Sequence, residues 1–121
     1  MDQLKELENT FLEEYESSKV LINLSKKKSA LILLSKALFA LTDYMIFNKY
    51  KKLPKNHSER FRILEEKEYD TYSILNEVWS KYTDLYSKPA LEDSIILLKE
   101  AIKKVIEKNE EISEKIKKAI K

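Results

Sequence analysis

The stretch ALILLSKALFALTDYMIF, residues 30–47, decides the fold of this chain because it is apolar on nearly every side. It is about as long as a membrane span, but Lys36 and Asp43 interrupt it, and each would be costly inside a membrane. A helix that is apolar all round is otherwise found buried among other helices. We therefore predict that a helix over about 26–50 is the most buried element of a cytoplasmic protein that makes no membrane contact.

Helical spacing of apolar residues continues on both sides of this stretch, whereas strand-like alternation never lasts more than a few residues. Ser25 is a possible N-cap for the central helix, and Pro54 marks a turn after it. Further helices are expected at about 2–24, 57–66, 68–87 and 89–119. A chain of 121 residues has room for one hydrophobic core. The sequence thus predicts a single domain, 1–121, with an all-α, antiparallel up-and-down bundle of four long helices and one short helix.

The last predicted helix carries an apolar seam whose steps alternate between four and three residues, as in a coiled coil. The seam consists of Leu91, Ile95, Leu98, Ile102, Val105, Asn109, Ile112, Ile116 and Ala119. Glu111 with Lys115 and Glu114 with Lys118 are favourably oriented pairs for the exposed face of such a helix. Ile112 and Ile116 extend beyond what the bundle obviously covers, and a polar residue such as Asn109 can fix the register between paired helices.

A stripe of aromatic residues follows the helix predicted at 68–87. Aromatic side chains at helical spacing are more often core or subunit interface than platforms for stacked bases. Leaving the stripe and the end of the seam exposed would forgo several kcal/mol of apolar burial. We therefore predict a homodimer related by a two-fold axis; the alternative is that the last helix frays beyond Lys108. The candidate interface residues are Tyr72, Trp79, Tyr82, Tyr86, Ile112 and Ile116.

Composition excludes several classes of site. Glycine and cysteine are both absent, so glycine-rich phosphate loops, nucleophile elbows, disulfides and thiolate metal sites cannot form. The chain has one histidine and no cluster of carboxylates at ligand spacing, so neither a metal nor another cofactor is predicted. Many lysines and glutamates with few glutamines favour a thermophilic source.

The stretch LPKNHSERFRIL, residues 53–64, contains the only histidine and the only two arginines of the chain. Asn56 followed by Glu59 fits a capping box, which predicts that a helix begins at residue 57. A basic turn that leads into a helix N-terminus suits an anion, since free N–H groups and the helix dipole add to the side-chain charge. The candidate ligands of a nucleotide or RNA phosphate are Lys52, Lys55, His57, Ser58 and Arg60.

Two other interpretations of this stretch stay open. In the simpler one, Asn56 and Glu59 only cap the helix, His57 packs beside the turn and the lysines are solvated. In the other, His57 acts as a general base, but it has no cysteine to activate, and any partner must come from elsewhere in the fold. The net charge is only +2, and the lysines at 26–28 lie at the opposite end of an antiparallel bundle, so a large nucleic-acid surface is not expected.

Loosely spaced motifs across residues 10–106 resemble those of a known family. A helix of the form A-x2-LL-x2-AL-x-AL-x2-Y is followed by a basic turn with a proline, an H-S-x-x-F element and an aromatic D-x-Y. The matching residues are Ala30, Leu33, Leu34, Ala37, Leu38, Ala40, Leu41, Tyr44, His57, Ser58, Phe61, Asp84 and Tyr86. In these features the chain resembles the HEPN superfamily of small helical bundles from archaea and bacteria. The resemblance implies a four- to five-helix bundle, usually dimeric, that is often encoded beside a minimal nucleotidyltransferase or acts as a ribonuclease in toxin–antitoxin and defence systems.

The ribonuclease members of that family carry Arg-x4–6-His near the end of the third long helix. Here the corresponding segment reads SKYTDLYSKP, residues 80–89, and the only histidine precedes both arginines. The nuclease chemistry is therefore not carried over, no catalytic residue is assigned, and His57 and Ser58, at the H-S position, are expected to be structural or ligand-binding. We predict a non-catalytic HEPN-like binding module that works with a nucleotidyltransferase or a toxin–antitoxin partner. The alternatives are a divergent ribonuclease that uses His57 and a purely structural helical scaffold.

Overall fold

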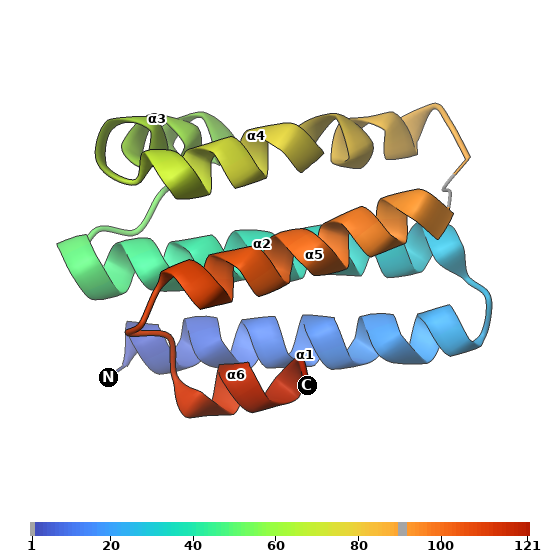
Figure 1. The fold of residues 1–121 in the computed structure, drawn as a ribbon, viewed down its shortest axis with the longest axis horizontal. Helices are drawn as coiled ribbons and strands as arrows, with labels where there is room; N and C mark the ends of the chain where they lie inside the picture. Colours follow the sequence, from blue (N-terminus) through green and yellow to red (C-terminus); the bar gives the residue numbers. More distant parts are fainter. Residues whose placement is uncertain (1, 90–91) are drawn as a thin grey trace.

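Helices are the only regular elements in the part of the chain that the structure describes, which confirms the all-α prediction. The computed structural model describes residues 2–89 and 92–121, and of Tyr86 it describes the backbone alone. The elements, drawn in Figure 1, are α1 (Gln3–Asn23), α2 (Lys27–Tyr50), α3 (His57–Lys67), α4 (Tyr69–Thr83), the 3-10 turn η1 (Asp84–Tyr86), α5 (Glu92–Lys108) and α6 (Glu114–Ala119).

The apolar stretch that opens the sequence forms most of α2, which lies at the centre of the fold. Helices α1 and α5 both pack on α2, and α3 with α4 form the layer above it in Figure 1. By length and composition α2 could cross a membrane, with a mean hydropathy of 1.7, but 72% of that window is buried inside the fold. Burial by neighbouring helices is what we expect of the core helix of a bundle.

The turn between α1 and α2 is closed in a different way from the one predicted. The N–H of Lys26 bonds to the carbonyl of Leu21 (2.9 Å), and the N–H of Ser25 bonds to that of Ile22 (3.0 Å). This pair of bonds is the Schellman motif that ends a helix, and it places Ser25 in the left-handed region at φ 59°. The prediction of Ser25 as an N-cap for α2 is therefore wrong, because this residue ends α1 instead.

The predicted single helix over 89–119 is also wrong in its second half. Helix α5 ends at Lys108, the chain turns, and α6 folds back against α1 (Figure 1). Asn109 is 2% exposed, and its side-chain amide donates to the carbonyl of Val105 at 2.7 Å. A side chain that bonds to the preceding backbone turn competes with continued helix, as short polar residues do. Leu91, the first residue of the predicted seam, lies outside the described residues.

The fold-back buries the two isoleucines that we expected at a dimer interface. Ile112 is 3% exposed and Ile116 is fully buried within a single chain. Ser113 caps α6 by accepting from the N–H of Ile116 (3.3 Å), and its hydroxyl donates to Glu8 of α1 (2.5 Å). The argument that Ile112 and Ile116 need a second copy to cover them does not hold, and neither does the alternative of a frayed end.

Candidate functional site: an aromatic groove over a buried ion pair

A buried ion pair joins α2 to α3. Arg60 donates from Nε to Oδ1 of Asp43 at 2.7 Å and from Nη2 to Oδ2 at 2.9 Å, and each residue is only 8% exposed. Both carboxylate oxygens are thus engaged by one guanidinium in the bidentate geometry that gives the strongest such pairs. Because Asp43 lies in the middle of the apolar helix α2, the pair fixes where α3 can dock on the core.

The same guanidinium sets the chemistry of the only histidine. Nη1 of Arg60 lies 2.6 Å from Nδ1 of His57. A guanidinium can only donate, so Nδ1 must accept, and the proton of the neutral ring is carried by Nε2. His57 is therefore held as a hydrogen-bond donor through Nε2.

The pKa values of the linked groups follow from burial and charge. Burial lowers the pKa of His57 below its ordinary 6.5, and the Arg60 charge lowers it further. Burial raises the pKa of Asp43, while the hydrogen bonds and charge of Arg60 act against that rise. His57 is consequently neutral at pH 7. Its one lone pair faces Arg60, so it is poorly placed to serve as a general base.

Aromatic side chains from α2 and α4 contact the His57 ring. Its centroid lies 4.8 Å from that of Phe39 on α2 and 4.9 Å from that of Trp79 on α4. Phe61 extends the wall along α3, at 5.2 Å from Trp79, and Tyr72 lies beyond it at 6.1 Å from Phe61. The edge-to-face geometry of these contacts is the one that aromatic quadrupoles prefer.

An open groove runs along this wall between α3 and α4. It has a volume of about 450 Å³, within the range of small-molecule sites. One exposed cation lies on it, since the Arg62 side chain is 60% exposed and its only partner among the described residues is Glu59 at 3.6 Å. The lining residues are His57, Ser58, Phe61, Arg62, Glu65, Tyr72, Asn76 and Trp79.

The N-terminus of α3 is capped as the sequence predicts. Asn56 Oδ1 accepts from the N–H of Glu59 at 2.8 Å. The Glu59 carboxylate accepts from the N–H of Lys55, also at 2.8 Å, and so reaches one residue further back than in the usual capping box. The Glu59 N–H in the first turn of α3 and the Lys55 N–H just before the cap are therefore occupied and do not face an anion.

The predicted phosphate ligands do not come together as one site. His57 and Ser58 both line the groove, whereas the exposed side chains of Lys52 and Lys55 are not part of its lining. Arg60 is buried and fully engaged by Asp43 and His57, so its prediction as a phosphate ligand is wrong. The cation that lines the groove is instead Arg62, which is exposed and paired with Glu59.

The aromatic stripe of α4 divides between the groove and its support. Tyr72 and Trp79 line the groove. Tyr82 packs behind them, with its ring centroid 5.2 Å from that of Phe39. The side chain of Tyr86 lies outside the described part of the structure. A role for this stripe in a dimer stays a prediction.

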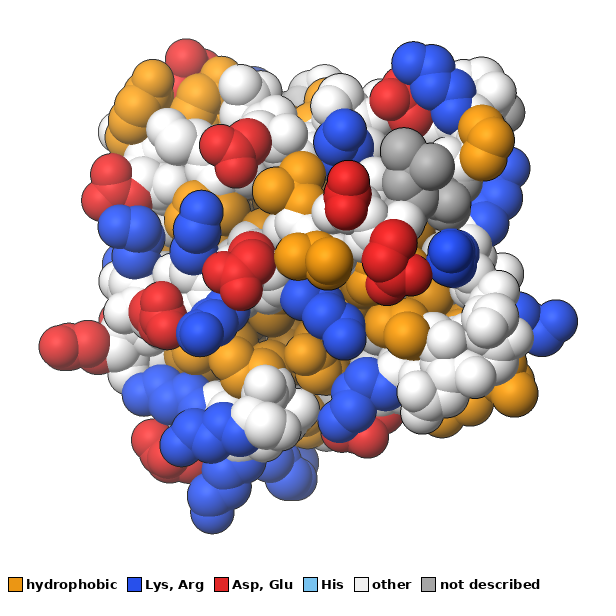
Figure 2. Space-filling view, turned by 45° about the vertical axis from the view of Figure 1, so that its right-hand side comes forward, with side chains coloured by type: hydrophobic (Ala, Val, Ile, Leu, Met, Phe, Trp, Pro, Cys, Tyr) orange, Lys and Arg blue, Asp and Glu red, His pale blue; other side chains and the backbone are white. Residues whose placement is uncertain are grey.

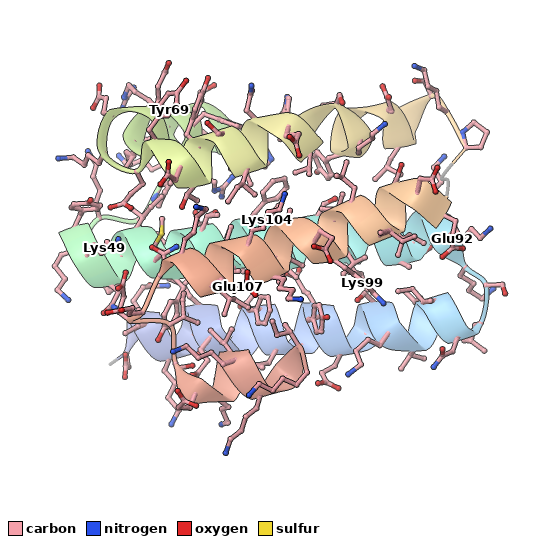
Figure 3. The ribbon with its side chains drawn as sticks, in the orientation of Figure 1. Lys49, Tyr69, Glu92, Lys99, Lys104 and Glu107 are labelled. Carbon is pink, nitrogen blue, oxygen red and sulfur yellow. The ribbon has the colours of Figure 1, made fainter. Side chains whose placement is uncertain are left out.

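A second polar cluster joins the C-terminal end of α2 to two distant segments. Nζ of Lys49 lies 3.1 Å from Glu68, at the junction of α3 and α4, and 3.3 Å from Glu111, after α5. It also donates to Oδ1 of Asn109 at 3.2 Å, and the Tyr50 hydroxyl donates to Glu68. Burial lowers the pKa of Lys49, but the two carboxylates outweigh burial and raise it. Figure 3 shows Lys49 at the end of the bundle where α5 stops.

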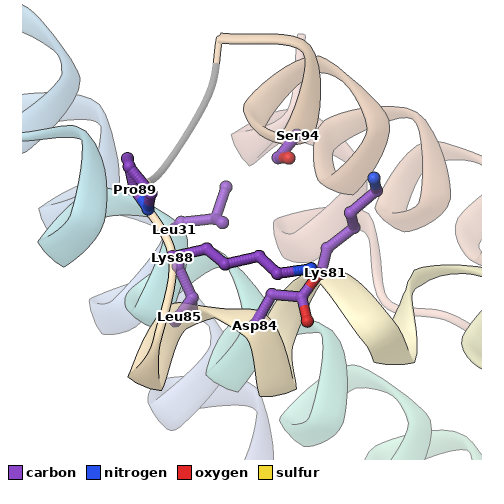
Figure 4. Close-up of a pocket in the computed structure, with 7 residues that line it drawn as sticks. All are labelled: Leu31, Lys81, Asp84, Leu85, Lys88, Pro89 and Ser94. Carbon is purple, nitrogen blue, oxygen red and sulfur yellow. Dashed lines mark ion pairs between the residues drawn. The ribbon is translucent and has the colours of Figure 1, made fainter.

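Other surface features of the described residues carry no ligand that we can assign. A hollow of about 200 Å³ between η1 and α5 contains an ion pair of its own, Lys88 with Asp84 at 3.7 Å (Figure 4). No group of three or more His, Asp or Glu that could hold a metal is found in the same residues. Lysines and carboxylates are interspersed over the upper and middle parts of the face in Figure 2, and basic side chains gather only at its lower edge.

Comparison with protein-family models, with curated proteins and with solved structures gave no match.

Sequence reasoning missed the partner of Arg60, although a signal was present. A carboxylate in the middle of a helix that is otherwise apolar all round has to be paired once it is buried. Arg60 and Arg62 are the only arginines, and α3 begins after a short turn, so an arginine partner of Asp43 could only be one of these two. The groove itself had no such signal, because Phe61 and Trp79 are 18 positions apart and meet only through the packing of α3 on α4.

Proposed function

We propose that this chain is a non-catalytic binding module whose α3–α4 groove holds a nucleotide base or single-stranded RNA. The scaffold in this proposal is an antiparallel bundle of α1, α2, α4 and α5, with α3 and α6 as short additions. The observation that carries the proposal is the fixed His57 ring in an aromatic wall beside the exposed Arg62. This geometry argues against the divergent ribonuclease, since the lone pair of His57 is taken by Arg60.

Each part of the groove has a counterpart in a nucleotide. Aromatic faces stack on bases with roughly 1–3 kcal/mol per base. The N–H at Nε2 of His57 matches an acceptor on a base edge, and Arg62 matches a phosphate. With only Arg62 as a cation in the groove lining and a net charge of +2, the site suits one or two nucleotides better than a long stretch of RNA.

The resemblance to the HEPN superfamily suggests that such a module works with another protein. We propose a nucleotidyltransferase or a toxin–antitoxin partner, encoded beside this chain. Co-purification of the products of neighbouring genes tests this part, and a genome context with neither kind of gene would count against it.

Trp79 is the only tryptophan of the chain and lines the groove, so its fluorescence reports directly on binding. We would titrate the protein with ATP, with GTP and with short single-stranded RNA at two salt concentrations. Binding should quench Trp79, and Arg62→Ala should weaken it by about tenfold and lower its salt dependence. Lys28→Ala, at the opposite end of α2, is the matched control and should bind as the wild type does.

The outcomes separate the three functions. Absence of quenching by every ligand would reject the groove proposal and favour a structural scaffold. Cleavage of RNA that is lost in His57→Ala would favour the ribonuclease. Binding that Arg62→Ala leaves unchanged would move the ligand away from this groove.

A further inference from the structure

The sequence of the α5–α6 segment is compatible with a second conformation in which α5 and α6 form one continuous helix. The apolar seam keeps its alternating steps from Ile95 to Ala119 without interruption at the turn. Residues 109–113 read NEEIS and contain neither glycine nor proline, and no residue of this turn has positive φ. Backbone geometry therefore does not require the bend. Two local side chains favour it, because Asn109 bonds to the carbonyl of Val105 and Ser113 caps α6.

One charge pair favours the straight conformation. Glu111 with Lys115 spans the turn and has the spacing and orientation that favour a straight helix. In the described chain this pair does not form, and Glu111 contacts Lys49 instead. The bend is held by tertiary contacts, namely the Lys49 cluster, the Ser113–Glu8 bond and the burial of Ile116.

We propose that a second copy of this chain supplies α6 in place of the chain's own. In that arrangement residues 109–112 straighten, α5 and α6 form one helix over residues 92–119, and each α6 packs on α1 of the other copy. The contacts that α6 and Ser113, the residue before it, make with α1 are then made between chains, as in domain swapping. The occupant of the α1 surface is thus a second copy, and the interface differs from the aromatic stripe.

The direction of α6 fits a two-fold exchange. Figure 1 shows α6 running back along the bundle, opposite to α5. Consider a second copy rotated by 180° about an axis near the turn. The α5 of the second copy then points towards the first copy. When the α6 of the second copy is straightened, it lies along α1 of the first copy and runs in the same direction as the α6 of the first copy. A straight helix over 92–119 is about 42 Å long at 1.5 Å per residue, enough to reach across the join.

Two substitutions in the turn test this exchange in opposite directions. The turn is closed by bonds from Asn109 N to Ile106 O and from Ile112 N to Asn109 O, both 3.3 Å, so Glu110→Pro removes neither. Proline suits the second position of such a turn but interrupts a straight helix, and should weaken dimerisation by more than about a hundredfold. Asn109→Leu removes the contact with Lys49, completes the apolar seam and should raise the dimer fraction. Light scattering after refolding at micromolar to millimolar concentration measures both.

Cysteine cross-linking tests the contact itself, because the chain has no native cysteine. Glu8→Cys and Ser113→Cys chains are mixed, refolded together at high concentration and oxidised. We expect a disulfide between the two different chains; the double variant in one chain, refolded when dilute, confirms that the two positions can be bridged. A protein that stays monomeric at every concentration even as Asn109→Leu would overturn the proposal. So would a dimer that Glu110→Pro leaves intact.

Discussion

The Asp43–Arg60 pair should be the most sensitive point of the fold. Each residue is 8% exposed, so Asp43→Leu leaves a buried guanidinium without a counter-charge. Breaking a buried pair in this way costs roughly 3–5 kcal/mol. Total stability of such a domain is roughly 5–15 kcal/mol, and for this chain length we take roughly 3–6 °C per kcal/mol, so Tm should fall by roughly 9–30 °C.

A double-mutant cycle followed by urea unfolding and far-UV circular dichroism measures the coupling. Arg60→Met should also destabilise, but less at pH 5 than at pH 7, because an unpaired buried carboxyl can take up a proton whereas a guanidinium cannot lose one. The double variant Asp43→Leu/Arg60→Met should recover most of the loss. Arg62→Met, an exposed arginine two residues away, is the control and should stay within about 0.5 kcal/mol of wild type. Single losses below about 1 kcal/mol, or a double variant that loses the sum of both, would refute this reasoning.

Three further predictions concern other positions. The pKa of His57 is lower in the folded protein than in the unfolded chain, so the unfolded chain binds more protons at this residue. The free energy of unfolding should therefore be intact above about pH 7.5 and fall as the pH drops through about 6.5. His57→Asn, which keeps an acceptor for Arg60, should lack that pH dependence in unfolding curves. Lys49→Met should destabilise by at most about 1 kcal/mol, less in high salt, because its contacts are partly exposed; a loss that salt does not change would contradict this. Ile116→Ala should speed amide exchange in α6 with little change in α4, and uniform acceleration would show that α6 does not open alone.

Local chemistry made much of the fold predictable. Apolar residues on every side placed α2 in the core. Asn56 with Glu59 predicted that α3 begins at residue 57, which is where it begins in the structure. The end of α5 was not predictable in this way, because Asn109 continues the seam pattern. Helix α5 stops where the Asn109 side chain bonds both to the carbonyl of Val105 and to Lys49, 60 positions earlier in the chain. Arg60 was misassigned for the same reason, since its partner lies 17 positions away on another helix.

Both of these unpredicted contacts start from polar residues in the second half of α2. Apolar burial drives α3 and α6 onto the core but does not fix their position, because it is non-directional. Asp43 sets the position of α3 through Arg60, and Lys49 sets the turn before α6 through Asn109 and Glu111. Buried or half-buried polar groups serve fold specificity in some proteins at a cost in stability. If they do so here, loss of Asp43 should disturb the groove and leave α6 in place, whereas loss of Lys49 should speed amide exchange in α6 without releasing it, and should leave Trp79 fluorescence unchanged.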